Sequence, residues 1–233
     1  MSVSLIIPTL NEEETIHAVL SAVPRQKIDE IIVVDGGSTD QTVSIAAQSD
    51  VKIIHEERRG YGQACATGAD VAEGDILVFM DADGADDPAQ ITLLLDQYVR
   101  GKADLILGSR LSGEIAEGAM PWHQWFGNWL SALIIRLLYG IPLTDLSPFR
   151  AIRASSLNQL SMKEMTYGWP TEMIVKAIRA GCKIIEIPVS YRPRAGGKSK
   201  ISGTFRGTVF ATYHILWTII KFRYFKTSKT GNP

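Results

Sequence analysis

The feature that most constrains the fold is the alternation of short apolar runs and helix-like segments along the first 110 residues. Five runs are rich in β-branched residues and almost continuously apolar, which is typical of strands buried on both faces. They span 4–8, 30–35, 51–55, 75–81 and 103–109. Helical patterns lie between them at 12–22, 40–48, 61–72 and 88–100. The alternation predicts an α/β fold with a mostly parallel central sheet flanked by helices.

Local signals predict where some of these helices begin. Asn11 followed by Glu14 resembles a capping box. Asp87 followed by Pro88 is an N-cap before a favoured first-turn proline. Ser38 or Asp40 can cap the helix predicted at 40–48.

The second half of the chain has a different pattern. Residues 122–139 carry Trp122, Trp125 and Trp129 at helical spacing, and 205–225 form another apolar and aromatic stretch that ends in basic residues. These two segments predict C-terminal amphipathic helices. A helix at 168–181, a strand at 182–192 and a Gly/Lys/Ser loop at 194–204 complete the pattern. No repeat or sharp boundary appears, so we expect one domain over 1–233, with a core of about 1–110 elaborated by 111–233.

Charge is distributed unevenly, although the net charge is only −1. The last acidic residue is Glu186, and nine Lys and Arg residues follow it. Residues 1–186 therefore hold 15 basic and 25 acidic residues. An acidic body with a basic tail predicts an anionic partner for the tail. We expect no nucleic-acid partner, and the sequence leaves a homo-oligomer open.

The cysteines and the apolar runs indicate a compartment. Cys65 and Cys182 lie far apart and match no metal-ligand spacing, which fits a reduced, cytoplasmic protein. The first residues do not have the charged and apolar regions of a signal peptide. No apolar run reaches 18 residues, so we expect no membrane-spanning helix.

Polar side chains follow three of the predicted strands, at 8–12, 35–40 and 81–87. The carboxyl ends of parallel strands meet at one edge of the sheet, where ligands bind in such folds. None of these loops has the GxGxxG or GxxxxGK[ST] pattern, which disfavours a dinucleotide-binding or P-loop protein.

Four aspartates lie within 81–87. Asp81 and Asp83 directly follow an apolar strand, and alternation in extended backbone sends both carboxylates to the same side. That arrangement favours a hard divalent cation that also binds a diphosphate. We interpret Asp86 and Asp87 instead as a solvated turn that starts the next helix. Asp35 precedes two glycines and is free to accept hydrogen bonds from a base or a ribose.

Six segments together resemble the family 2 glycosyltransferases of the GT-A fold, and within them the dolichyl- and polyprenyl-phosphate sugar synthases. They cover nearly the whole chain and read "SLIIPTLNEE", "VVDGGSTDQT", "FMDADGADDP", "LILGSR", "TDLSPFR" and "RAGGKSKISGT". Two of them depart from the family pattern. The family continues Asp-x-Asp with Leu-Gln-His-Pro, where this chain has Gly84-Ala85-Asp86-Asp87-Pro88. The family's Ser-Gly-Phe-Arg is here Ser147-Pro148-Phe149-Arg150.

The resemblance implies roles for particular residues. Three residues of the first loop would lie at the nucleotide site: Pro8, Asn11 and Glu12. Asp35 would recognise the base, and Asp81 and Asp83 would bind Mg²⁺ or Mn²⁺ on a nucleoside-diphosphate sugar. Arg110 would approach the phosphates. The half at 1–110 would then bind the nucleotide sugar, and the half at 111–233 the acceptor.

The expected reaction is inverting transfer of a hexose from a donor of the GDP-mannose or UDP-glucose type, most simply to a polyprenyl or dolichyl phosphate. A lipid phosphate is already anionic and needs no general base, but two phosphates held together need positive charge. The candidates are Arg110, Arg150, Arg194, Lys198 and Lys200. A soluble hydroxyl acceptor would instead require a base. Glu172 or Asp145 would be that base, although Glu172 also fits a first-turn helix acid.

Two further questions stay open at this point. The segments at 122–139 and 205–225 are either helices on a membrane surface, which would make the protein peripheral at the cytoplasmic face, or ordinary helices packed on the sheet.

Other classes of protein also stay open. A haloacid dehalogenase-type phosphatase also uses Asp-x-Asp, but it has this motif after its first strand and has Thr or Val where this chain has Ala85. A nucleotidylyltransferase would require a basic first loop, whereas the first loop of this chain is acidic. A non-catalytic protein would bind a sugar nucleotide or a lipid without turnover.

Overall fold

The computed structural model describes residues 1–101, 103–196 and 205–224, and for 205–211 and Tyr224 the backbone alone. Lys198 and Lys200, two of the expected phosphate contacts, lie outside the described residues.

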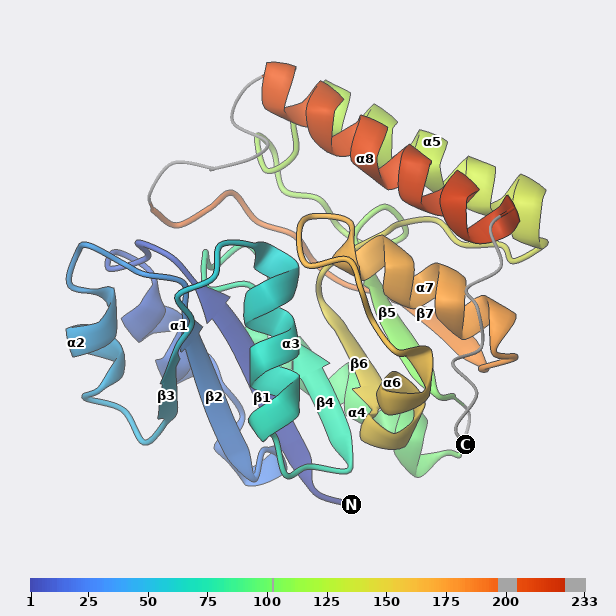
Figure 1. The fold of residues 1–233 in the computed structure, drawn as a ribbon. Helices are drawn as coiled ribbons and strands as arrows, with labels where there is room; N and C mark the ends of the chain where they lie inside the picture. The colour runs from blue at the N-terminus through green and yellow to red at the C-terminus, as the bar shows by residue number, and fades with distance from the viewer. Residues whose placement is uncertain (102, 197–204, 225–233) are drawn as a thin grey trace.

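One seven-stranded sheet forms the centre of the protein, with the strand order β3-β2-β1-β4-β6-β5-β7 (Figure 1). The strands are β1 (Val3–Thr9), β2 (Glu30–Asp35), β3 (Lys52–His55), β4 (Ile76–Phe79), β5 (Leu105–Ser109), β6 (Arg150–Arg153) and β7 (Ile184–Pro188). All neighbours are parallel except β6, which runs antiparallel to β4 and to β5. The predicted mostly parallel sheet is therefore confirmed, while β6 was not predicted as a strand.

Helices cover both faces of the sheet. They are α1 (Ile16–Ala22), α2 (Thr42–Ala46), α3 (Tyr61–Val71), α4 (Ile91–Val99), α5 (Trp122–Tyr139), α6 (Ala154–Leu160), α7 (Trp169–Arg179) and α8 (Phe205–Tyr224), with short 3₁₀ turns at Arg25–Lys27 and Pro88–Gln90. Alternate residues of each strand point to opposite faces, so Leu5 and Ile7 enter one core with α1 and α4, while Ile6 enters the other with α3, α6 and α7.

The helices α5 and α8 lie side by side in an outer layer, with α7 between them and the sheet (Figure 1). The Tyr139 hydroxyl donates to the Ile219 carbonyl at 2.7 Å, which ties the two helices together. The helix predicted at 122–139 has these bounds in the structure. Within the described part of the chain, no helix has both the length and the apolarity needed to cross a membrane.

Two helix starts test the capping signals. Asp87 accepts a hydrogen bond from the Ala89 amide at 3.1 Å and precedes Pro88, which confirms this N-cap. The capping box predicted at Asn11 is wrong, because α1 begins only at Ile16. Asn11 instead has a positive φ of 51° and accepts from the Thr39 amide at 2.8 Å, joining the loops after β1 and β2.

Register brings the functional loops to one edge. Thr9 pairs with Asp35, so β1 and β2 end level, and Ile6 pairs with Phe79 at the end of β4. Because β6 is antiparallel, Arg150 at its start also pairs with Phe79. The loop that precedes β6 therefore lies at the same edge as the loops that follow β1, β2 and β4.

Candidate active site

The carboxyl edge consists of the loops 8–12, 35–40 and 81–87, and hydrogen bonds join the first two loops. The Asn11 amide donates to Ser38 Oγ at 2.9 Å, and the Glu12 amide donates to Thr42 Oγ1 at 2.7 Å. Pro8, half-buried near the end of β1, pairs with Val34 of β2. Pro8, Asn11 and Glu12 are thus gathered at this edge, and their contact with a nucleotide stays a prediction.

Asp35 is held at the end of β2 by its own loop. It is buried, and its carboxylate accepts from the Gly37 amide at 3.2 Å and from the Ser38 amide at 3.1 Å. Gly37 reaches this position with a φ of 90°, which a side chain would disfavour. His55 Nδ1 lies 3.5 Å from Asp35 Oδ2 on the neighbouring strand. The loop therefore fixes the orientation of a carboxylate at the expected base-binding position.

Asp81 lies two residues beyond β4 with one oxygen enclosed. Its Oδ1 is buried and has no hydrogen-bond partner. Burial, and next the charge of Asp83, raise the pKa of Asp81 to about 7, although a hydrogen bond from Tyr61 of α3 opposes the rise. Such an oxygen is costly to bury unless a ligand completes it. Sequence reasoning missed Tyr61, because its contact with Asp81 joins a helix to a distant strand end.

Asp83 and Glu12 share one arginine. Asp83 Oδ2 lies 3.0 Å from Arg194 Nη1, and Arg194 Nη2 donates to Glu12 Oε1 at 2.7 Å and to Oε2 at 3.0 Å. Arg194, predicted as a phosphate contact, is thus brought into the Asp-x-Asp site from the far end of the chain.

The donor set at this edge fits a hard divalent cation that shares its shell with a substrate. No group of three or more His, Cys, Asp or Glu residues gathers for a metal within the described ranges. Mg²⁺ commonly takes only one or two carboxylates and completes its shell with water and substrate phosphates. The enclosed and unpartnered Oδ1 of Asp81 beside Asp83 fits that mode of binding.

Asp86 corrects the sequence interpretation. It was expected in a solvated turn, but only 3% of it is exposed and its Oδ1 is enclosed without a hydrogen-bond partner. Burial, and next the charge of Asp81, raise the pKa of Asp86 well above its usual range. Asp86 forms an antiparallel bridge with Tyr191, a contact between distant segments that no local pattern reveals.

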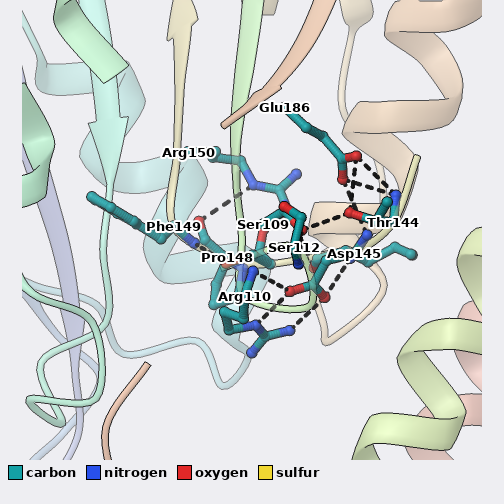
Figure 2. A network of polar contacts seen from close by, with 11 residues as sticks. Ser109, Arg110, Ser112, Thr144, Asp145, Pro148, Phe149, Arg150 and Glu186 are labelled. Carbon is teal, nitrogen blue, oxygen red and sulfur yellow. Dashed lines mark hydrogen bonds and ion pairs between the residues drawn. The ribbon is translucent and has the colours of Figure 1, made fainter. Parts of the chain in front are cut away.

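Arg110 and Asp145 form a buried ion pair (Figure 2). Arg110 Nε donates to Asp145 Oδ2 and Nη2 to Oδ1, each at 2.8 Å, and the Arg110 amide adds a third bond at 3.0 Å. Burial acts to raise the pKa of Asp145, but Arg110 outweighs it and the pKa lies below its usual value. Asp145 is therefore badly suited to be the base expected for a hydroxyl acceptor. The approach of Arg110 to phosphates stays a prediction.

Arg150 is fully buried, and its guanidinium contacts backbone carbonyls, among them that of Pro148 (Figure 2). Its guanidinium donates to the carbonyls of Pro170 at 2.7 Å and Pro148 at 3.3 Å, and also to that of Ser147. Burial lowers the pKa of Arg150 to about 10. These hydrogen bonds fix the loop at 144–149 and disfavour contact of Arg150 with a phosphate, which stays a prediction.

Glu172 also has structural partners. It is fully buried on the first turn of α7 and accepts from the Lys163 and Glu164 amides at 2.9 and 2.6 Å. Lys176 Nζ lies 2.8 Å from its Oε1. Both oxygens are engaged, which disfavours a role as general base, and that role stays a prediction. Glu186 is similarly engaged, since it accepts from the Thr144 and Asp145 amides (Figure 2).

Comparison with known proteins identifies the family. Residues 4–161 match the model described as glycosyl transferase family 2. An uncharacterized glycosyltransferase of Mycobacterium tuberculosis (strain ATCC 25618 / H37Rv) is 36% identical over 219 residues, covering 94% of this chain and 98% of that protein. The undecaprenyl-phosphate mannosyltransferase of Micrococcus luteus is 34% identical, covering 89% and 90%. The polyprenol monophosphomannose synthase of Mycolicibacterium smegmatis is 31% identical, covering 86% and 81%.

A solved structure supports the fold. Glucosyl-3-phosphoglycerate synthase from Mycobacterium tuberculosis, in complex with Mn²⁺, UDP and phosphoglyceric acid, superposes with a TM-score of 0.78 at 22% identity. The superposition covers 99% of this chain and 81% of that one. The family match and these similarities, together with the seven-stranded sheet and its acidic edge, exclude the phosphatase and nucleotidylyltransferase alternatives. The chain therefore belongs to glycosyl transferase family 2 and is a glycosyltransferase with the GT-A fold.

Proposed function

We propose that the protein transfers a hexose, with inversion, from a nucleoside-diphosphate sugar of the GDP-mannose or UDP-glucose type to a polyprenyl or dolichyl phosphate. The observation that carries the proposal is the pair Asp81 and Asp83 at the end of β4, with the Oδ1 of Asp81 enclosed and unpartnered. The pair lies beside the loops after β1 and β2, which supply Asp35 for a base or ribose. The names of the Micrococcus and Mycolicibacterium relatives support the acceptor.

Asp81 and Asp83 are the residues that would hold Mg²⁺ or Mn²⁺. The bound ion would supply positive charge against the diphosphate leaving group. The protein's own part is to fix both carboxylates, through Tyr61 at Asp81 and through the Ala85 amide, which donates to Asp83 Oδ1 at 2.9 Å. The Mn²⁺ and UDP in the glucosyl-3-phosphoglycerate synthase structure support a metal and a nucleotide at a site of this fold.

The charges around the loop at 144–149 support an acceptor that needs no base. Asp145 and Glu172 were the candidates for deprotonating a hydroxyl, and both carboxylates are tied to a cation and to backbone amides. A phosphate oxygen is a nucleophile without deprotonation at neutral pH. A soluble hydroxyl acceptor remains the alternative and is separated by experiment below.

We also propose that the outer layer rests on a lipid surface, at the cytoplasmic membrane face. Aromatic side chains of α5 and α8 are exposed: Trp122, Trp125, Phe126, Trp129, Tyr213 and Trp217. Trp122 is 73% exposed, and Trp125 and Trp129 stack with ring centroids 6.4 Å apart. Lys221 and Arg223 add positive charge in the last turn of α8. Aromatic rings beside basic residues are typical of helices that lie at a lipid–water boundary.

A panel of nucleotide sugars tests the reaction. Thermal shift with Mg²⁺ or Mn²⁺ identifies the donor, and product formation is then compared between polyprenyl phosphate and soluble sugar or glycerate acceptors. We expect stabilisation by one donor only when the metal is present, and transfer to the lipid phosphate. Transfer to a soluble hydroxyl acceptor alone would refute the proposed acceptor, and transfer undiminished by chelation would refute the metal.

Liposome flotation tests the surface separately. The triple variant Trp122→Gln, Trp125→Gln and Trp129→Gln should lose partition into anionic liposomes while it retains turnover on a short, water-soluble prenyl phosphate. Equal partition of the variant and the unaltered protein would contradict the lipid-facing role. The division into a donor half at 1–110 and an acceptor half at 111–233 stays part of the same proposal.

A further inference from the structure

We propose that Arg194 is a built-in cation of the donor site, which holds Asp83 and Glu12 while the site contains no divalent metal and gives up Asp83 when the metal–diphosphate binds. The inference rests on the proposed metal-dependent function. It adds that Arg194 and the metal compete for one carboxylate, so the metal alone binds weakly and a diphosphate strengthens its binding.

The contacts of Arg194 join two loops of the carboxyl edge. One guanidinium nitrogen lies 3.0 Å from Asp83 Oδ2, and another donates to both oxygens of Glu12. The exposed fractions of the three side chains are 26% for Arg194, 9% for Glu12 and 11% for Asp83. Charge-assisted contacts that are largely shielded from water are stronger than those of exposed pairs. Arg194 is therefore a substantial competitor for any cation at Asp83.

The backbone around Arg194 is docked on the Asp-x-Asp loop. The Arg192 amide donates to the Ala85 carbonyl at 2.9 Å, and the Ala195 amide donates to the Asp83 carbonyl at 3.2 Å. Gly196 packs so closely on Glu14 that an added Cβ would clash with the Glu14 side chain. The segment 192–196 is thus positioned by main-chain contacts, which are independent of the Arg194 side chain.

Electrostatic interactions explain why the charged Arg194 side chain stays between Glu12 and Asp83. Glu12, Asp81 and Asp83 would repel one another without a positive charge between them. Burial disfavours the charged form of Arg194, but Asp83 and Glu12 outweigh that effect and raise its pKa. Arg194 is consequently always charged, and a divalent ion at Asp83 would meet both an occupied oxygen and a neighbouring positive charge.

The Arg194 side chain also has a hydrogen-bond donor that an anion could use. Arg194 Nε is enclosed and has no hydrogen-bond partner. When Asp83 is released, Nη1 also becomes available, and separate oxygens of a diphosphate can accept charge-assisted hydrogen bonds from Nε and from Nη1. A diphosphate therefore offers Arg194 a replacement for the carboxylate that it loses. Metal and diphosphate should then strengthen each other's binding, and by linkage they must do so equally.

Calorimetric titration of the full chain with Mn²⁺, in the absence and in the presence of UDP, or of GDP where UDP has no effect, tests the proposal. For Arg194→Met we expect Mn²⁺ alone to bind about tenfold more tightly than to the unaltered protein, with the strengthening by UDP reduced by a similar factor. Arg194→Lys keeps the charge and should retain weak binding of Mn²⁺ alone. Arg192→Met is the matched control, since Arg192 pairs with Asp87 at 2.9 Å and should leave both affinities unchanged.

The possible results separate this inference from the proposed function. Weaker or unchanged binding of Mn²⁺ alone by Arg194→Met, in a variant that melts cooperatively like the control, would overturn the competition. Failure of the unaltered protein to bind Mn²⁺ with either UDP or GDP would overturn the metal-dependent function, and the competition with it. Tighter Mn²⁺ binding in Arg194→Met together with intact coupling to UDP would retain the competition and refute the transfer of Arg194 to the diphosphate.

Discussion

The carboxyl edge and the region around the loop at 144–149 both bury charged groups, but they differ in how completely these groups are paired. At the carboxyl edge, Asp81 Oδ1, Asp86 Oδ1 and Arg194 Nε are enclosed without hydrogen-bond partners. Around the loop and on α7, a cation or backbone amides engage each of the carboxylates of Asp145, Glu172 and Glu186.

This difference separates chemistry from support. A buried polar atom without a partner costs free energy that folding does not recover, and such atoms gather where a ligand completes them. A buried charge with all its partners holds loops in place and has little capacity left for a substrate. Both regions contain the same types of charged residue, so only the hydrogen-bond and ion-pair partners of these residues distinguish the two regions. Four substitutions test it.

The largest effect is expected at the carboxyl edge. Asp83→Asn should reduce metal-dependent transfer by about a thousandfold, because it removes charge where the diphosphate leaves. Turnover is measured with Mg²⁺ or Mn²⁺ at saturating donor, and Asp87→Asn serves as the control, since Asp87 caps the turn before α4. Activity that survives in Asp83→Asn, or in the unaltered protein after chelation, would remove this edge from the chemistry.

The buried pair should matter for stability. Asp145→Asn leaves the charge of Arg110 uncompensated, and we expect a loss of about 3–5 kcal/mol in the free energy of unfolding. Urea denaturation measures the loss. Arg192→Met breaks an exposed pair instead and should cost less than about 1 kcal/mol. Equal costs for the two variants would show that burial does not distinguish the pairs.

Glu172 should behave as support as well. Glu172→Gln keeps an acceptor for the Lys163 and Glu164 amides but loses the ion pair with Lys176, and we expect about 1–3 kcal/mol of destabilisation. Turnover of the folded variant should stay close to normal at a temperature well below its unfolding midpoint. A large fall in kcat with unchanged stability would return Glu172 to the candidate bases.

The fourth expected effect is a dependence on pH. Burial raises the pKa of Asp81 to about 7, so the folded protein without metal retains a proton that the unfolded chain releases near pH 4. Asp81 therefore favours the folded state at low pH, and its contribution is lost as pH rises from about 4 to about 7. In the metal-free protein, Asp81→Asn should flatten this decline in the free energy of unfolding. An unchanged slope between variant and unaltered protein would contradict the raised pKa.

The sequence predicted the parts of the molecule that depend on local order. The first strands, the helices at 122–139 and 169–179, and the N-cap at Asp87 follow from periodicity and from neighbouring residues. The gathering of the three acidic loops followed from the parallel arrangement of the strands. The pairing of Asp83 with Arg194 did not, because 111 positions of chain separate the two residues.

The features that the sequence did not reveal share a physical cause. The strand β6 has only four residues and begins and ends with arginine, so its sequence shows no recognisable strand pattern. Its pairing with β4 and β5 decides its conformation. From the sequence we interpreted Asp145 and Glu172 as candidate bases, because their partners, Arg110 and Lys176, can be recognised only in the folded chain. Asp86 read as a solvated turn residue because the contact that buries it comes from Tyr191.

The reversed direction of β6 has a consequence for how such enzymes diversify. Because β6 enters the sheet at the carboxyl edge, the loop at 144–149 reaches the active site from a strand that carries none of the donor loops. If the proposed division into a donor half and an acceptor half holds, insertions or deletions there would reshape the acceptor side while β1, β2 and β4, and the loops that follow them, keep their places. A single antiparallel strand would then let the acceptor side change in evolution without a change in the donor loops.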